Sequence, residues 1–268
     1  MQGARAIPRL SFGARVASGE RVLPEEVGVA LSFNGTTQAV MMATPDHLAD
    51  FAYGFALTEG LVQPHEIESL EVVETARGLD VQIWVTRSAE ARLAERRRTM
   101  TGPVGCGLCG IDSLEQALRD DLPGVPHGRL RLTPDQVMAA VAALPAQQPL
   151  HDATRAAHCA AFWDGARMVL SREDVGRHNA LDKLAGALVR GGLARDGAVV
   201  LTSRVSIDLV QKVATLGAPV IIAVSSPTVG AVALAETLGI TLIAQARPDR
   251  FEAFSHTDRI STEATHVC

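Results

Sequence analysis

The pattern of apolar and polar positions predicts strands and one helix in the first third of the chain. Residues 27–33 and 37–42 read as two strands, and Asn34-Gly35 between them is the residue pair that a type I′ hairpin turn prefers. Thr44-Pro45 then resembles an N-cap and a first helical residue, ahead of apolar positions at helical spacing that end at Gly60. Further strands are expected at 70–73 and 79–85.

From residue 157 onward, short apolar runs alternate with helical patterns. Asp164-Gly165 marks a tight hairpin, and the run at 220–224 is apolar throughout, which fits a strand buried on both sides. The expected strands are 157–163, 167–170, 198–201, 219–224 and 240–244, and the expected helices are 179–189, 206–215 and 229–237. This alternation predicts a mainly parallel sheet with helices on its faces.

Proline and glycine gather at 123–128 and indicate a boundary, after which Thr133-Pro134 begins another helix that runs to about residue 144. We therefore predict two parts. Residues 1–126 form a smaller α+β N-terminal subdomain, and residues 127–268 form an α/β domain.

Composition narrows the class of protein. The chain has 268 residues, of which 47% are hydrophobic, and a formal charge of −5, so no overall basic field attracts nucleic acid. No run of eighteen apolar residues predicts a membrane span, and no signal peptide is recognisable. With only four cysteines, we expect a reducing cytoplasm.

Two of the four cysteines, Cys106 and Cys109, lie among three glycines at positions 105, 107 and 110. The loop 102–111 precedes a segment, 112–118, that reads as a helix start with a capping box from Ser113 to Gln116. A helix N-terminus lowers the pKa of a nearby thiol, and the glycines allow another molecule to come close. The pattern indicates a reactive thiol.

Other interpretations of this pair are open. A zinc site needs two further ligands, and the nearest candidates, His158-Cys159, are adjacent rather than spaced. A thioredoxin-like pair would follow a strand directly, whereas Arg96-Arg97-Arg98 and Thr101-Gly102-Pro103 precede this one. Inert structural cysteines would have apolar neighbours instead of glycines.

Polar residues gather where the predicted strands end, which is where open α/β sheets bind ligands. Arginines and hydroxyl groups before helix N-termini suit phosphate oxygens. We therefore hypothesise an anion site at one sheet edge. Its loops are 172–179, the group Thr202, Ser203 and Arg204, the segment 225–228 that begins with Ser225, and the group Gln245, Ala246, Arg247, Pro248, Asp249 and Arg250.

Together these segments resemble the FdhD/NarQ family of formate dehydrogenase accessory sulfurtransferases. The resemblance runs from about residue 26 to 260. It rests on Asn34-Gly35 with Thr44-Pro45, on 54–60, on the Gly-Cys-Gly-Leu-Cys-Gly loop at 105–110, on the Arg-Glu-Asp-Val-Gly-Arg-His run within 172–183, and on Ser203-Arg204 with 210–212.

This resemblance implies a sulfur carrier with a fold like that of cytidine deaminases, in which a three-layer α/β domain binds the cofactor. A cysteine desulfurase would pass sulfane sulfur to Cys106, with Cys109 beside it, and the sulfur would go to the molybdenum of a bis(molybdopterin guanine dinucleotide) cofactor before insertion into formate dehydrogenase. The stretch from Gln245 to Arg250 would contact that cofactor. A homodimer is expected, and no permanently bound metal.

Two other functions are weighed against this one. A zinc-dependent nucleoside deaminase needs a His-x-Glu and a Pro-Cys-x-x-Cys motif, but the chain has no His-x-Glu, and Gly105 stands where the proline would be. A non-catalytic cofactor chaperone would bind the cofactor without using Cys106.

Overall fold

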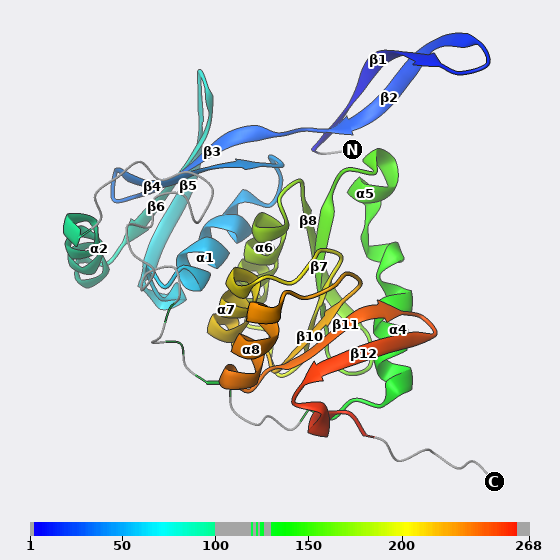
Figure 1. Cartoon of the computed structure of the whole chain (residues 1–268). Coiled ribbons are helices and arrows are strands. Elements are labelled where there is room, and N and C mark those ends of the chain that lie inside the picture. The colour runs from blue at the N-terminus through cyan, green and yellow to red at the C-terminus, as the bar shows by residue number, and fades with distance from the viewer. Residues whose placement is uncertain (1–2, 100–118, 120–121, 123, 126–129, 262–268) are drawn as a thin grey trace.

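The computed structural model describes residues 3–99, 119, 122, 124–125 and 130–261. Its largest element is a six-stranded sheet with the strand order β12-β11-β10-β9-β7-β8 (Figure 1). The bounds are β7 (His158–Trp163), β8 (Met168–Asp174), β9 (Ala198–Leu201), β10 (Val220–Ala223), β11 (Thr241–Arg247) and β12 (Arg250–Ser255).

The predicted α/β organisation is confirmed, but the prediction of a mainly parallel sheet is wrong. Only β9, β10 and β11 run parallel to one another, and three of the five neighbouring strand pairs are antiparallel. The reason is that β7 and β8 form a hairpin, as do β11 and β12, so the chain returns at once without a crossover helix.

Helices cover both faces of this sheet (Figure 1). In β9, Val199 and Leu201 point into the core beneath one group of helices, whereas Ala198 and Val200 point into the core on the other side. Strands buried on both faces require apolar residues at consecutive positions. The first group is α6 (Arg177–Arg190), α7 (Ile207–Leu216) and α8 (Val229–Leu238), and the second is α4 (Pro134–Ala143) and α5 (Pro149–Thr154).

A second sheet, with the order β4-β3-β6-β5, packs one face on α1 (Leu48–Thr58) and has a core of its own. The predicted turn is confirmed, since Asn34 and Gly35 both have positive φ, 44° and 76°. Its strands are β3 (Val27–Phe33), β4 (Thr36–Ala43), β5 (Ile67–Thr75) and β6 (Gly78–Val85), followed by α2 (Arg87–Thr99).

The predicted helix start at Thr44-Pro45 is wrong, because α1 begins at Leu48 with His47 as its N-cap. Thr44 instead forms hydrogen bonds with residues 174, 175 and 183. Its backbone N–H donates to Asp174 Oδ2 at 3.0 Å, its hydroxyl oxygen accepts from the N–H of Val175 at 3.2 Å, and its carbonyl accepts from Lys183 Nζ at 2.8 Å. Bonds to a distant part of the chain thus replace the local cap.

Helices α1 and α6 touch backbone to backbone. A Cβ atom added at Gly54 would lie 1.6 Å from the carbonyl oxygen of Asp182, and one added at Gly186 would lie 1.8 Å from that of Asp50. Only glycine permits this approach, which ties the smaller sheet and its helix to the larger one.

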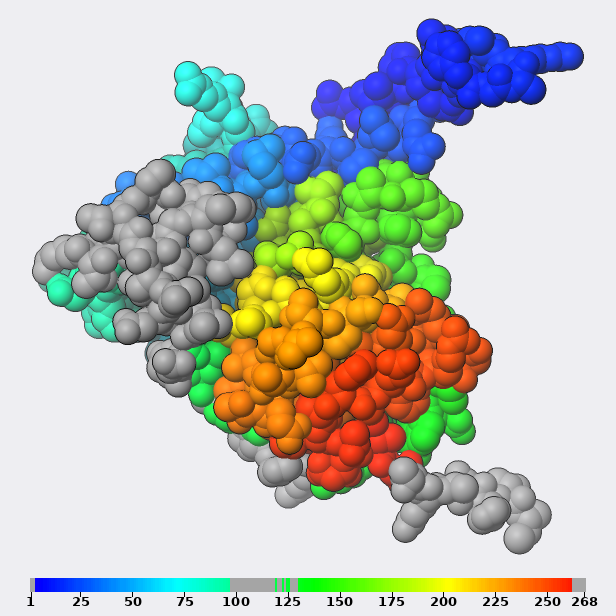
Figure 2. All heavy atoms as spheres, viewed as in Figure 1, coloured from blue at the N-terminus to red at the C-terminus, as the bar shows by residue number. Residues whose placement is uncertain are grey.

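Several elements have no counterpart among the sequence predictions. An exposed hairpin of β1 (Ala4–Phe12) and β2 (Val16–Pro24) projects from the molecule, with part of β2 in contact with α5 (Figures 1 and 2). Helices α2 and α5, strand β12 and three short 3₁₀ helices (Pro64–Glu66, Pro145–Gln147 and Thr257–Arg259) are also additional. The division at residue 126 lies outside the described residues and stays a prediction, as does the likeness to cytidine deaminases.

Candidate functional site

The polar loops after β9, β10 and β11 lie side by side at one edge of the larger sheet. The N–H of Val205 donates to the carbonyl of Ser226 at 3.1 Å, and the N–H of Thr228 donates back to Val205 at 2.9 Å. The N–H of Gln245 donates to the carbonyl of Ser225 at 3.2 Å. Three of the four loops that were grouped from the sequence therefore adjoin, and anion binding by them stays a prediction.

The loop after β9 is partly structural. The hydroxyl oxygen of Thr202 accepts from the N–H of Cys159 at 2.9 Å and so ties β9 to the start of β7. Ser203 is buried, and its hydroxyl donates to the carbonyl of Arg204. Of these three predicted site residues, Arg204 is the one with an exposed side chain, and it is the one best placed to meet a ligand.

The residues from Gln245 to Arg250 differ in their structural roles and in their exposure. Gln245 has a left-handed φ of 49° within a bulge of β11, and its side-chain amide donates to the hydroxyl of Ser226. Ala246 is buried in the core, and Arg247 Nη1 donates to the carbonyl of Val224 at 2.6 Å. The turn that follows, made of Pro248, Asp249 and Arg250, is exposed.

Three helix N-termini meet at this edge, since α6, α7 and α8 follow β8, β9 and β10. A helix N-terminus carries a partial positive charge and unpaired N–H groups, which suit anions. The side chain of His178 at the start of α6 forms an ion pair with Asp208 at the start of α7, so these two ends are adjacent. Arg177, the first residue of α6, has a buried Nε with no hydrogen-bond partner.

Two residues at this edge, Asp208 and His158, were not predicted from the sequence to belong to an anion site. Burial opposes the charge on Asp208, but its hydrogen bond to His178 and the charge of that ring hold its pKa well below the ordinary value. His158 begins β7 opposite Asp174. Burial, followed by the charge of Arg177, lowers the pKa of His158, so this ring is neutral at pH 7. Neither residue stands in a recognisable local motif.

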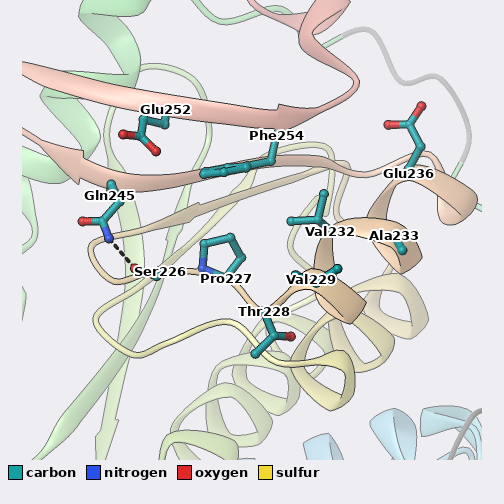
Figure 3. Close-up of a pocket in the computed structure, with 10 residues that line it drawn as sticks. All are labelled: Ser226, Pro227, Thr228, Val229, Val232, Ala233, Glu236, Gln245, Glu252 and Phe254. Atoms are coloured by element: carbon teal, nitrogen blue, oxygen red, sulfur yellow. Dashed lines mark hydrogen bonds between the residues drawn. The ribbon is translucent and has the colours of Figure 1, made fainter.

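A groove of about 710 Å³ opens beside Gln245, between α8 and β12 (Figure 3). The rings of Phe254 and Pro227 and the side chain of Val232 line its apolar part, and Gln245 and Glu252 stand at one end. Phe254 and Glu252 share one face of β12 because side chains alternate along a strand. The groove combines an aromatic face with amide and carboxylate groups.

The run 172–183, which carries much of the resemblance, is mainly structural. Lys183 Nζ lies 2.6 Å from Asp174 Oδ2, and both side chains are fully buried. Asn179 donates to the carbonyl of Met42 at 2.8 Å and to Asp174 at 3.0 Å. These bonds, with those of Thr44, join the two sheets.

A second buried cluster holds the end of α1. Lys212 Nζ in α7 lies 2.9 Å from Asp182 and 2.5 Å from Glu59, and it donates to the hydroxyl of Thr58 at 3.0 Å. Although burial opposes the charge on Lys212, the two carboxylates raise its pKa, so it stays protonated. Arg119 Nη1 also donates to the carbonyl of Thr58, at 2.8 Å.

Cys106, Cys109 and the expected helix start at 112–118 lie outside the described residues, as does Cys268. Cys159 is buried, and burial, with Glu173, raises its pKa to about 12, so this thiol is unreactive. Within the part of the chain that the structure describes, no three His, Cys, Asp or Glu side chains are grouped to hold a metal ion, and no helix is long and apolar enough to cross a membrane. The first finding does not test a zinc site at Cys106.

Comparisons with known proteins agree with the resemblance. The chain is 51% identical to the sulfur carrier protein FdhD of Agrobacterium fabrum over 247 residues, 91% of each chain. It is 44% identical to that of Bordetella parapertussis over 262 residues, which are 96% of this chain and 94% of the relative.

Among solved structures, the crystal structure of a protein from Desulfotalea psychrophila, described as a formate dehydrogenase accessory protein, matches with a TM-score of 0.77. The match covers 97% of this chain and all of that one, at 24% identity, and it shows a shared fold. The family model FdhD/NarQ matches residues 24–261. The chain therefore belongs to the FdhD/NarQ family.

Proposed function

We propose that this protein is a sulfurtransferase that carries sulfane sulfur as a persulfide on Cys106. The donor is a cysteine desulfurase, and the acceptor is the bis(molybdopterin guanine dinucleotide) molybdenum cofactor before it enters formate dehydrogenase. The reaction takes place in the cytoplasm, and the carrier works as a homodimer with a deaminase-like cofactor-binding domain. Membership of a family whose named relatives are sulfur carriers is the observation that carries this proposal.

The sulfur step is an exchange between thiol and disulfide-like sulfur. The thiolate of Cys106 attacks the outer sulfur of the donor persulfide, the S–S bond of the donor breaks, and the donor cysteine leaves as a thiolate. Cys106 then holds the sulfur as –S–SH. Cys109 next to it can stabilise the thiolate, receive the sulfur or close a resting disulfide.

The sheet edge supports phosphate binding. Arg204 is exposed beside the N-terminus of α7, and Arg177 offers a buried Nε without a partner at the N-terminus of α6. Helix N-termini and guanidinium groups together hold phosphate oxygens. A dinucleotide cofactor would place its pyrophosphate there.

The groove beside Gln245 supports binding of the guanine base. Phe254 can stack on a planar ring, and the carboxylate of Glu252 can accept from ring N–H groups, which guanine has on its Watson–Crick edge. The base would then lie next to the phosphate site.

Mass spectrometry tests the carrier role. The full-length protein is incubated with a cysteine desulfurase and cysteine, and we expect a mass gain of one sulfur atom that disappears in Cys106→Ala and in the presence of a reductant. Cys159→Ala is the matched control and should gain sulfur normally, since that thiol is buried. A full sulfur gain in Cys106→Ala would contradict the proposal that Cys106 is the carrier. Formate dehydrogenase maturation that stays intact in Cys106→Ala would favour the chaperone function.

Titration calorimetry with guanosine diphosphate tests the cofactor site separately. Arg204→Ala and Arg177→Ala should each weaken binding about 10-fold, as expected for a charge-assisted hydrogen bond of about 1.5 kcal/mol. Phe254→Ala should weaken the binding of guanosine diphosphate but not the binding of pyrophosphate. Arg167→Ala, whose side chain is 82% exposed in the β7–β8 turn, is the control. Equal affinity in all variants would rule out this edge as the nucleotide site.

A further inference from the structure

A polar pocket of about 240 Å³ lies where the smaller sheet and its helix meet the larger sheet. Its walls come from the turn between β4 and α1, from the 3₁₀ helix Pro145–Gln147 with the start of α5, and from the end of β8. It shares no lining residue with the groove beside Gln245. Since a water molecule takes up about 30 Å³ in the liquid, the pocket has room for about eight non-hydrogen atoms.

The positive charge in these walls is already balanced. Arg172 donates from Nε and Nη2 to Asp50 Oδ2 at 2.8 and 2.7 Å, and from Nη1 to the carbonyl of Ser171 at 2.7 Å. Arg190 pairs with the other carboxylate oxygen of Asp50. Burial, followed by the charge of Arg172, lowers the pKa of His47, so this ring is neutral at pH 7. The pocket therefore offers no unpaired positive charge to a simple anion.

Two carboxylates, in contrast, line the pocket and have acceptor capacity left. Asp46 Oδ1 accepts from the N–H of His47 at 2.7 Å, but Asp46 Oδ2 lies 3.5 Å from His47 Nε2, which is too long for a good hydrogen bond. Glu173 accepts from the N–H groups of Leu150 and His151 at 2.7 and 2.8 Å, which favours its ionised form although burial raises its pKa. An ammonium group is the donor that suits such a pair.

Uncharged and already balanced donors line the same pocket. Gln147 Oε1 accepts from the hydroxyl of Ser171 at 3.3 Å, and Gln147 Nε2 has no hydrogen-bond partner among the described residues. A guanidinium group has five N–H donors, and the bonds of Arg172 to Asp50 and Ser171 use three of them. These donors suit a carboxylate whose charge is balanced within the ligand itself.

We propose that this pocket binds a small neutral α-amino acid. The ammonium group of the ligand donates to Asp46 and Glu173, and its carboxylate accepts from Gln147 and Arg172. Pro149 and the neighbouring leucine add apolar wall for a short side chain. Alanine, serine and valine all fit the room for about eight non-hydrogen atoms. This binding does not depend on the proposed sulfur chemistry.

The backbone at the mouth of α1 agrees with a ligand site. His47 has a left-handed φ of 52°, which residues with a side chain rarely adopt, and it precedes α1 without a side-chain cap bond. Residues held in such conformations gather at ligand sites. Because the pocket has walls from both sheets, a bound amino acid would also join them, and a saturating concentration should raise the unfolding temperature.

Titration calorimetry on the full chain tests the ligand class with matched probes. Alanine carries both charged groups, ethylamine lacks the carboxylate, and propionate lacks the ammonium group. We expect alanine, serine and valine to bind, and ethylamine and propionate to bind at least about 10-fold more weakly than alanine, because each loses charge-assisted hydrogen bonds. Propionate that binds as tightly as alanine, or no binding by any of the three amino acids, would overturn the proposal.

Two variants assign the two ends of the ligand. Asp46→Asn should weaken both alanine and ethylamine at least about 10-fold, whereas Gln147→Glu should weaken alanine by a similar factor and leave ethylamine unchanged or tighter. Asp135→Asn, at an exposed position in α4 outside the pocket, is the matched control and should bind alanine like wild type. Thermal unfolding without ligand shows that each variant is folded. Wild-type alanine affinity in folded Asp46→Asn or in folded Gln147→Glu would refute this mode of binding.

Discussion

The contact between α1 and α6 gives the sharpest stability prediction. In Gly54→Ala the added methyl group would lie 1.6 Å from the carbonyl oxygen of Asp182, whereas an ordinary contact needs at least 3.4 Å. The obstacle is helix backbone, so the helices must separate by nearly 2 Å along a buried interface.

Two opposing effects decide whether Gly54→Ala raises or lowers the free energy of unfolding. Alanine favours a helix over glycine by about 1 kcal/mol. Overpacking costs typically about 1–3 kcal/mol, and the upper part of that range or more applies when backbone must move. We therefore expect Gly54→Ala to lower the free energy of unfolding by about 2–4 kcal/mol.

Urea unfolding followed by the fluorescence of the two tryptophans measures this change. Gly230→Ala in α8 is the matched control, because its methyl group would meet only the end of the Ile207 side chain, at 2.7 Å, which can rotate away. The control should stay within about 1 kcal/mol of wild type. If Gly54→Ala proved as stable as Gly230→Ala, the reasoning from backbone contact would be refuted.

Three further predictions concern buried titratable groups. Lys183→Met leaves the Asp174 carboxylate buried without its cation, and urea titrations should show a free energy of unfolding lower by about 3–5 kcal/mol. The double variant Lys183→Met/Asp174→Leu, which leaves no buried charge unpaired, should lose less. Because the folded pKa of His158 lies below its unfolded value of 6.5, the unfolded chain binds more protons below that pH. Stability should therefore fall as the pH drops from about 6.5 toward the folded pKa, and the loss should be smaller in His158→Gln when unfolding is measured at pH 7.5 and 5.5. Cys159 should resist iodoacetamide at pH 8 until the protein is unfolded, as peptide mapping would show.

The amino-acid sequence by itself determined those features whose causes are local. The Asn34-Gly35 turn follows from the freedom of these residues to adopt positive φ. The strands predicted at 198–201 and 219–224, observed as Ala198–Leu201 and Val220–Ala223, follow from apolar runs. Where β9, β10 and β11 end, polar loops adjoin at one edge, because parallel neighbouring strands must end together. The reactivity of Cys106 and Cys109, inferred from their glycine neighbours, stays a prediction because both residues lie outside the described residues.

Only the tertiary structure decided what depends on contacts between distant residues. Thr44 reads locally as a helix cap, yet Asp174 and Lys183 bind its backbone from 130 residues away and more. Gly54 looks like a poor helix residue until α6 is seen against it. Local propensities are worth less than about 1 kcal/mol per residue, and buried ion pairs and backbone contacts outweigh them.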